Sequence, residues 1–268
     1  MTTDIADTTS FTPSATAFVC DPARPVLAHG RVLRMGASVA PHCHPRGQLL
    51  WAMRGVLRVV SGASVWIVPP SHAVWIPGGT LHHVVTESEA DTRNLYVDPS
   101  CPVRAGDPGC AVLLLTPLMR ALILRMGEDP GEAPHDARRL RLCAVVLDEI
   151  AALPEAPLSL PGGHDPRLAR LAGHLGQNPA DPRPLTELAA IAGASPRTLE
   201  RLFRAETGLT FRQWRARLRL LSAIERLGRG ESSTAIAWSL GYSSPSAFVA
   251  AFRQQFGCPP QSYLQAGG

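Results

Sequence analysis

Lysine is absent from this chain of 268 residues, so all 26 of its basic side chains are arginine. No apolar run approaches the ~18 residues that a membrane-spanning helix needs, and we therefore expect no membrane contact. The first residues also lack a basic start followed by an apolar stretch, which excludes the usual pattern of a secretory signal. Together these absences predict a cytoplasmic protein.

Paired C-x-x-C spacing is missing as well. Scattered cysteines fit a reducing cytoplasm with buried or idle thiols, and a redox sensor is the alternative. The segment from Met1 to Ala17 is rich in threonine and serine and carries acids, so we expect a disordered tail. The six cysteines are Cys20, Cys43, Cys101, Cys110, Cys143 and Cys258.

One sequence pattern occurs twice between residues 188 and 264. Each copy has a short apolar stretch that ends in glycine, then a Ser-Pro pair, then an apolar stripe with the i, i+3, i+4 spacing of a buried helix face. The two copies keep one register, which is an improbable result of chance. Ser195 and Ser244, Phe203 and Phe252, Gly208 and Gly257, and Trp214 and Tyr263 are all 49 residues apart.

The chemistry of each copy predicts a helix-turn-helix. Glycine can adopt the left-handed conformation that lets the chain reverse tightly after a first helix. Ser195 and Ser244 can then cap a second helix by accepting hydrogen bonds from its free amides. Pro196 and Pro245 follow at the first helical position, where no amide is needed.

The free face of each second helix carries polar side chains that suit DNA. An arginine fork can bridge guanine O6 and N7 or clamp a phosphate. Because the second copy has Ala247 and Ala250 where long polar side chains could stand, we expect it to contact fewer bases. The alternative is that these charges form only a solvated helix face. The candidate DNA-binding residues are Arg197, Glu200, Arg201 and Arg204 in the first copy, and Ser244, Ser246, Arg253 and Gln254 in the second.

A long amphipathic helix is predicted between the copies, from Phe211 to Leu227. Its length of about 25 Å, at ~1.5 Å per residue, would hold two recognition helices near one ~34 Å turn of duplex apart. From Asp165 onward the formal net charge is +6, whereas the preceding part carries −2. The basic part is the one that we expect to meet phosphate.

The segment from about Asp165 to Leu264 resembles the DNA-binding domain of the AraC/XylS family of bacterial transcription regulators. This resemblance implies that Arg197, Glu200 and Arg201 contact bases from the first recognition helix. It places Pro245, Ser246 and Ala250 in that role on the second helix, and Ala250 departs from the arginine that is frequent there. The motifs behind it are Leu188-Ala189, Ser195, Leu199, Arg201, Phe203 and Gly208 in the first copy, and Ile236-Ala237, Gly241-Tyr242, Ser246, Phe248, Phe252, Phe256-Gly257 and Pro259-Pro260 in the second.

Residues 18–110 have a different pattern, in which short apolar runs alternate with turn residues. They predict an all-β barrel or sandwich. His42-x-His44, Gln48, and Pro77-x-Gly79-x-x-His82 resemble the two motifs of the cupin barrel, whose histidines often hold a divalent metal. Gln48 replaces the usual carboxylate. The predicted strands are Leu49 to Met53, Val56 to Val60, Val65 to Val68, and Ala73 to Ile76.

Three imidazoles that converge on a cavity can bind zinc, nickel, iron or manganese and leave a position open for a ligand. The candidate metal ligands are His42, His44, Gln48 and His82. The alternative is a metal-free pocket in which these residues bind an organic effector or one another. We expect the effector site to include Arg46, Gln48, Trp51, Trp66 and Trp75, although a strand tryptophan is more often a core residue.

Two helices are predicted in residues 111–153, with a break around Pro130-Gly131. They form either a dimer surface or an intrachain layer against the barrel. The proline-rich residues 154–166 would link this region to the double helix-turn-helix domain of residues 167–268. The expected fold is therefore α+β with two domains: a cupin-like sensor barrel with a helical pair, then an all-α domain.

The sequence thus predicts a DNA-binding transcription regulator that responds to a small molecule or metal in its barrel. The resemblance implies double-stranded DNA, a small effector and a second copy of the chain as partners, and it admits RNA polymerase. A softer resemblance, in residues 45–50 and 68–77, is to regulators of efflux transporters. The alternative is a metal-dependent cupin enzyme fused to a DNA-binding module. We expect no enzyme, because no general base stands beside the histidines.

Overall fold

The computed structural model describes residues 10–106, 109–128 and 135–264. The predicted helix break at Pro130-Gly131 and the first nine residues of the predicted tail lie outside these ranges. Two compact units make up the chain. The first comprises Met1–Ser61 and Val68–Pro157, and the second comprises Gly62–Ile67 and Leu158–Gly268.

The first unit is built on two β-sheets. One contains neighbouring strands in the order β1-β3-β8-β5, and the other has the order β10-β7-β4-β9-β2. Apart from the parallel pair β1-β3, neighbouring strands in these two orders run antiparallel. The strands are β1 (Ser10–Phe11), β2 (Val26–Leu33), β3 (Ser38–His42), β4 (Gly47–Arg54), β5 (Leu57–Ser61), β7 (His72–Ile76), β8 (His82–Thr86), β9 (Ala90–Val97) and β10 (Ala111–Leu114).

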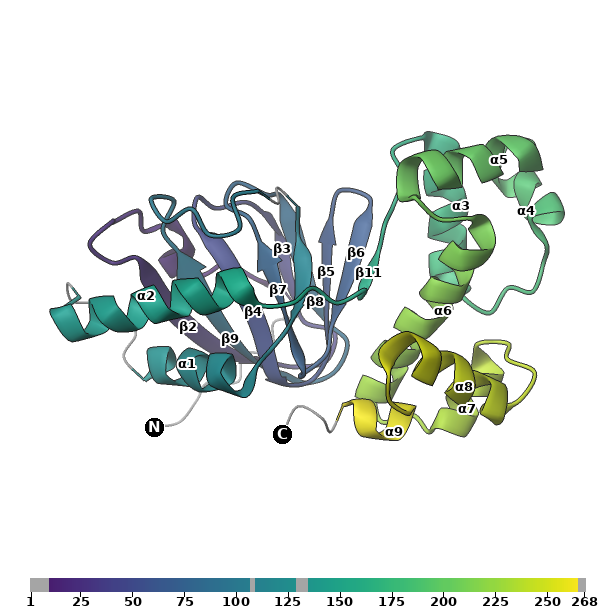
Figure 1. Cartoon of the computed structure of the whole chain (residues 1–268). Coiled ribbons are helices and arrows are strands. Elements are labelled where there is room, and N and C mark those ends of the chain that lie inside the picture. Colours follow the sequence, from purple (N-terminus) through teal and green to yellow (C-terminus); the bar gives the residue numbers. More distant parts are fainter. Residues whose placement is uncertain (1–9, 107–108, 129–134, 265–268) are drawn as a thin grey trace. The chain divides into compact units, whose positions relative to one another are not determined.

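Side chains alternate between the two faces of the five-stranded sheet, as the pleat of a strand requires. One face carries an apolar cluster that includes Leu49, Trp51, Trp75 and Leu95. Helices α1 (Pro117–Gly127) and α2 (Ala137–Ala152) cover this face, as Figure 1 shows, and contribute buried residues to the same cluster. The intrachain layer predicted for the helical pair is therefore present. The opposite face of the sheet turns toward the other sheet.

A tight turn between β4 and β5 requires a glycine. Gly55 has a φ of 87°, in the left-handed region that L side chains avoid. A Cβ atom at this position would also lie 2.2 Å from the carbonyl oxygen of Glu89. The residue can therefore have no side chain.

Three segments differ from the sequence prediction. The predicted disordered tail is wrong for its described part, because Ser10–Phe11 pairs with β3 and Ala17 is fully buried. The predicted helical region begins instead with a strand, since Ala111–Leu114 pairs with β7. The predicted linker is hydrogen-bonded: Ala156 donates its amide to Val112, and Ser159–Leu160 forms strand β11. Short segments of this kind gain their order from distant partners, which no local pattern reveals.

The second unit contains seven α-helices among its described residues, together with strands β6 and β11, which pair antiparallel. This pairing places Gly62–Ile67 in the second unit rather than in the predicted barrel domain. Trp214 donates its indole N–H to the Pro161 carbonyl at 2.9 Å and so anchors the chain that follows β11. The elements are β6 (Ser64–Val68), β11 (Ser159–Leu160), α3 (Pro166–Gln177), α4 (Leu185–Ala192), α5 (Pro196–Leu202), the π-helical turn η2 (Phe203–Thr207), α6 (Phe211–Gly228), α7 (Ser233–Ser239), α8 (Pro245–Phe256) and α9 (Pro260–Tyr263).

Among the described residues, no helix combines the length and the apolar character needed to cross a membrane.

Candidate DNA-binding helices and ligand cavity

The first repeat folds as a helix-turn-helix made of α4 and α5. Helix α4 ends at Gly193, whose φ of 66° lets the chain reverse. The Ser195 hydroxyl then accepts a hydrogen bond from the amide of Thr198 at 3.2 Å, and Pro196 occupies the first turn of α5. Helix α5 passes directly into the π-turn η2, which ends at Gly208 with a φ of 70°.

The second repeat has the same construction in α7 and α8. Gly241 has a φ of 72° after α7, and the Ser244 hydroxyl accepts a hydrogen bond from the amide of Ala247 at 3.1 Å. Helix α8 is regular over its 12 residues and ends at Gly257 with a φ of 78°. The predicted caps and turns are therefore present in both copies.

Each motif has an aromatic core that fixes its second helix. Phe203 is fully buried, and its ring centroid lies 5.5 Å from that of Trp214 on α6. Phe252 is fully buried as well, 5.2 Å from the ring of Tyr263 on α9. These contacts keep the opposite, polar face of α5 and α8 directed away from the core.

The predicted DNA-binding side chains lie on these polar faces. Arg197, Arg201 and Arg204 are exposed on α5 and η2, and Glu200 is half-buried beside them. Ser246, Arg253 and Gln254 are exposed on α8, whereas Ser244 is half-buried and serves as the helix cap. The exposed arginines of α5 and η2 thus outnumber the single one on α8.

Helix α6 is the 18-residue segment between the two motifs, with α3, α4 and α5 toward one end and α7, α8 and α9 toward the other (Figure 1). Thr210 and Gln213 form a capping box at its start. Arg215 and Arg219 donate to main-chain carbonyls of the loop after α3, at 2.7 Å to Arg183 and 3.0 Å to Pro179. The long helix predicted between the two copies is therefore present, is capped at its start and is hydrogen-bonded to the first motif.

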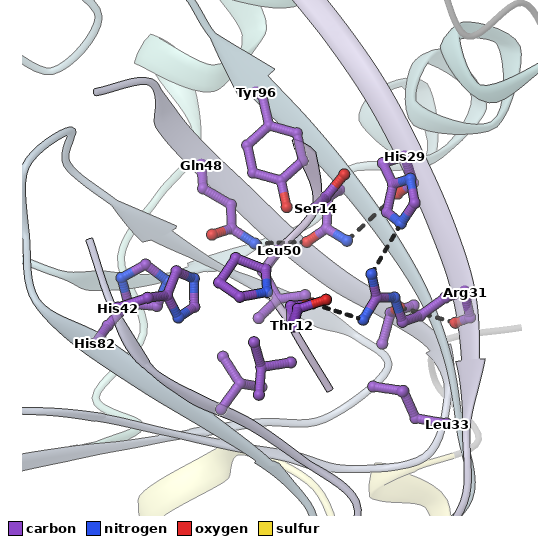
Figure 2. A pocket seen from close by; sticks show the side chains of 15 residues that line it. Thr12, Ser14, His29, Arg31, Leu33, His42, Gln48, Leu50, His82 and Tyr96 are labelled. Carbon is purple, nitrogen blue, oxygen red and sulfur yellow. Dashed lines mark hydrogen bonds between the residues drawn. The ribbon is translucent and has the colours of Figure 1, made fainter. Parts of the chain in front are cut away.

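A cavity of about 40 Å³ lies between the two sheets of the first unit. Strands β2, β3, β4, β8 and β9 each contribute lining residues, and the segment before η1 (Ala15–Phe18) contributes three more. Figure 2 shows His42 and His82 on one side of this cavity and His29 with Arg31 on the other. The lining residues are Thr12, Pro13, Ser14, His29, Arg31, Leu33, Val39, His42, Gln48, Leu50, His82, Val84, Thr92, Asn94 and Tyr96.

The three histidines among the four predicted metal ligands come together at the edge of this cavity. His42 ends β3 and pairs with His82 of β8, and their ring centroids are 4.2 Å apart. His44 lies 5.1 Å from His82 by the same measure. The three residues can direct one nitrogen each into a group in which these atoms all lie within 4.8 Å of one another.

Each of these imidazoles uses Nδ1 in the same way. The Nδ1 atoms of His42, His44 and His82 lie 2.7, 2.7 and 2.9 Å from the carbonyl oxygens of residues 40, 46 and 80. A carbonyl accepts only, so each Nδ1 carries a proton, and in the neutral rings of His42 and His82 the Nε2 atom keeps its lone pair. The buried Nε2 of His82 has no hydrogen-bond partner among the described residues. This tautomer is the one that metal-binding histidines adopt.

Burial favours the neutral form of two of the rings. It lowers the pKa of His42, and it lowers the pKa of His82 to about 4. The charge of neighbouring histidines lowers both pKa values further, against the opposing hydrogen bond to a carbonyl. Both imidazoles are therefore neutral near pH 7, as a metal ligand must be.

Gln48 lies beside this cluster. Its Oε1 is 3.0 Å from His44 Nε2, and its Nε2 donates to Asn94 Oδ1 at 2.7 Å. Asn94 in turn donates to the His29 carbonyl, which fixes the orientation of both amides. Gln48 thus directs a carbonyl oxygen toward His44. Because that oxygen accepts only, the contact is a hydrogen bond when His44 Nε2 carries a proton, and a divalent cation held by the three imidazoles would replace that proton.

The other predicted effector residues lie away from the cavity. Arg46 is fully buried, donates to the Tyr96 and Arg24 carbonyls at 3.0 and 2.9 Å, and pairs with Asp98 at 3.1 Å. Trp51 and Trp75 belong to the core beneath the helices. Trp66 is on β6, opposite Ser159 of β11. The core alternative for the tryptophans therefore holds for Trp51 and Trp75.

Several cavity residues were missed by the sequence analysis. His29 and Arg31 alternate along β2, and Thr92, Asn94 and Tyr96 alternate along β9. This period of two was the available signal, since it separates polar residues on one face from Val26, Ala28, Leu95 and Val97 on the other.

Paired recognition helices and a β-rich cavity define a helix-turn-helix transcription regulator with a ligand-binding domain. Residues 27–141 match the model of the AraC-like ligand binding domain, and residues 188–266 match a helix-turn-helix domain. The chain is 33% identical over 223 residues to the transcriptional regulator NimR of Escherichia coli, covering 83% of this chain and 81% of NimR. It therefore belongs to the AraC family of transcription regulators.

Other relatives match a smaller share of the chain or share less of its sequence. The transcriptional regulator RipA of Corynebacterium diphtheriae is 34% identical over 129 residues, which cover 48% of this chain and 36% of RipA. The DNA-binding domain of AdpA, solved with a target DNA, is 34% identical over 38% of this chain and 92% of that domain, with a TM-score of 0.35. ToxT from Vibrio cholerae is 9% identical over 90% of this chain and 98% of its own, with a TM-score of 0.39.

Proposed function

We propose that a divalent metal ion and a small effector, both bound at the barrel cavity, control how strongly α5 and α8 engage DNA. The observation that carries this proposal is the convergence of His42, His44 and His82, whose Nδ1 atoms are each held by a main-chain carbonyl and whose ligand nitrogens lie within 4.8 Å of one another. A bound metal would supply a positive charge and open coordination positions for an oxygen ligand. Zinc, nickel, iron and manganese all accept such donors.

The chain's own residues prepare this site. Main-chain carbonyls hold the three imidazole rings in orientation, and the amide of Asn94 orients Gln48. The segment Thr12–Ser14 and the strands around it line the cavity beside the site. An effector can alter DNA binding only if its affinity differs between two arrangements of the protein, so the proposal requires such a difference.

Elemental analysis of untagged protein tests the metal. We expect about one equivalent of metal in the parent chain and a loss of it in a His42→Ala/His44→Ala double variant. His164→Ala, at an exposed histidine of the second unit, is the matched control and should retain the metal. Equal metal content in the parent and the double variant would exclude this site.

We further propose that Arg197, Glu200, Arg201 and Arg204 contact the first major groove. Ser246, Arg253 and Gln254 would contact the next, with Ser244 near the same groove. Their exposure on the polar faces of α5, η2 and α8 supports this role. Binding of purified protein to a promoter fragment, with a scrambled duplex as competitor and with or without candidate inducers, tests it. Equal affinity for both duplexes under all conditions would contradict sequence recognition.

A homodimer through the helical pair is the partner that we propose in addition. Leu118, Leu124, Leu140 and Val145 remain at least 39% exposed on α1 and α2. Burial of such side chains against a second copy would be favourable. We expect Leu140→Glu to shift the protein toward monomer in sedimentation analysis, whereas Met35→Glu, at an exposed residue outside these helices, should not. A chain that is monomeric before substitution would contradict the proposal.

Relatives of this chain are transcription regulators, and we propose that it is not an enzyme. Turnover of a candidate ligand by metal-loaded protein would favour the alternative of a cupin enzyme fused to a DNA-binding module. Cytoplasmic location, contact with RNA polymerase and control of an efflux transporter gene stay predictions.

A further inference from the structure

The charged groups around the cavity are unbalanced. Its lining, as far as the described residues define it, includes Arg31 and three histidines but no aspartate or glutamate. Gln48 stands where a carboxylate would have compensated a bound cation. A divalent metal held by neutral imidazoles and an amide would therefore add two positive charges to a cavity that already contains a guanidinium. Such a cavity favours an anion.

Arg31 has contacts that hold it in place, and within residues 10–106, 109–128 and 135–264 none of its partners is an acid. Its guanidinium donates to the Thr12 carbonyl at 3.2 Å and lies 3.4 Å from His29 Nε2. It also lies 5.6 Å from the centre of the Phe11 ring. Burial, and then the charge of Arg31, lower the pKa of His29, so this ring accepts from the guanidinium as a neutral group. None of these three partners carries a negative charge.

A hydroxyl donor and several apolar side chains complete the lining of the cavity. Tyr96 is buried on β9 and lines the cavity with its phenol, whose pKa burial raises to about 12, so it keeps its proton. Figure 2 shows its hydroxyl directed inward beside Gln48. Leu33, Leu50 and Val84 add apolar surface. A guanidinium at one end, a candidate metal position at the other and apolar contacts between them suit an organic anion better than an inorganic one.

The volume limits the size of this anion. A bound water needs about 10–15 Å³ in this measure, so a cavity of about 40 Å³ accommodates about four non-hydrogen atoms. Acetate is of this size, and propionate is larger by one carbon. A ligand with so few atoms binds no more tightly than a dissociation constant of about 10⁻⁵ M.

We propose that the barrel selects a short-chain organic carboxylate and that Arg31 is the residue that distinguishes it from a neutral molecule of the same shape. The inference rests on the proposed effector function of the cavity. One carboxylate oxygen takes donors from Arg31, the short alkyl chain meets the apolar floor, and a metal at the histidine cluster increases the affinity. Arg31 acts in the metal-free chain as well, because its charge is uncompensated there too.

Titration calorimetry and saturation-transfer NMR on the full chain test this proposal, with acetate and propionate as probes and acetamide and propionamide as neutral counterparts. Both the zinc-loaded and the metal-free chain are titrated. We expect carboxylates to bind and amides to bind at least about tenfold more weakly, since hydrogen bonds to charged groups are the stronger ones. Arg31→Gln should reduce carboxylate affinity about tenfold or more.

Matched variants make the result decisive. Arg54→Gln removes the same charge from an exposed position outside the cavity and should bind as the parent does. Arg31→Lys retains the charge and should keep part of the preference for carboxylates, which also covers the case in which Arg31→Gln does not fold. A parent chain that binds amides as well as carboxylates, or binds neither, overturns the proposal. So does an Arg31→Gln variant with parental affinity and melting temperature. DNA binding, measured separately by gel shift, shows whether the regulator function itself has failed.

Discussion

The two helix-turn-helix motifs share a backbone design and differ in the side chains they expose. Gly193 and Gly241 both have a left-handed φ, and the caps Ser195 and Ser244 both have extended backbones and accept the corresponding amide hydrogen bond. Yet α5 with η2 exposes three arginines, whereas α8 exposes one arginine together with Ala250, Gln254 and Gln255. Turn and cap chemistry thus sets where the second helix of each motif lies, and the exposed side chains set what it contacts.

The motifs also differ in local helix geometry. After Leu202 the first motif continues as a π-turn over Phe203–Thr207, in which the Thr207 hydroxyl donates to the Phe203 carbonyl at 2.6 Å. The equivalent residue in the second motif is Phe256, and α8 stays regular to its end. A polar side chain that bonds back to the preceding turn accompanies the irregular turn in one copy only.

The largest expected effect tests whether the two cores are equivalent. Phe203→Ala and Phe252→Ala should each lower the free energy of unfolding by about 3–5 kcal/mol, because each removes a fully buried ring. Urea denaturation followed by circular dichroism measures both. Phe18→Ala, at a half-exposed ring, should cost much less. A large difference between Phe203 and Phe252 would show that the second core is packed differently.

The next effect tests whether the first motif dominates recognition. Arg201→Ala should cost about 1–3 kcal/mol at one operator position, as expected when an arginine contacts a base. Arg253→Ala should instead weaken all sequences alike and reduce the salt slope by about one, as a lost phosphate contact does. Titration of an operator mutant series at several salt concentrations separates the two outcomes. An Arg201 variant that binds every duplex as the parent does would remove this residue from the interface.

The two N-cap serines should contribute equally to the stability of the protein. Ser195→Ala and Ser244→Ala each leave a helix amide without its side-chain acceptor, and each should cost about 1 kcal/mol of stability. Thermal unfolding measures the loss. Asparagine at the same positions supplies another cap and should restore stability, so a variant that asparagine does not rescue would point to a role other than capping.

The smallest effect would reduce the difference between the motifs. Ala250 is exposed on α8, and Ala250→Arg should strengthen DNA binding by about 0.5–1 kcal/mol through a new groove or phosphate contact. Ala250→Gln provides the uncharged control. If both variants bind as the parent does, this position of α8 does not face the DNA.

Most features of the second unit could be predicted from sequence because they are local. A glycine, a serine and a proline within four residues of the first copy and five of the second determine each turn, and the i, i+3, i+4 stripe identifies the buried face. The same applies to His42 and His82, whose motif spacing indicated a cluster that the structure brings together. Strand β11 could not be found, because its two residues are ordered by pairing with β6 almost a hundred residues away.

Only some features of the cavity could be predicted from the sequence. Alternation along β4 already places Gln48 and Trp51 on opposite faces, so the tryptophan could have been assigned to the core. Arg31 and Tyr96 could not be placed beside the histidines, because their neighbourhood arises from the packing of two sheets rather than from one segment. Long-range pairing of this kind leaves no mark in a single sequence.

The hydrogen bonds of Arg46 divide the described start of the chain into two segments whose amide hydrogens we expect to exchange at different rates. One guanidinium holds carbonyls of Val19, Arg24 and Tyr96, so the backbone from Val19 onward is fastened to the barrel. The described residues before it, 10–18, are attached through the two-residue strand β1, the buried Ala17 and a few side-chain contacts. Amide hydrogen exchange should therefore change abruptly near Val19, with rapid local opening on its N-terminal side and slow exchange beyond it.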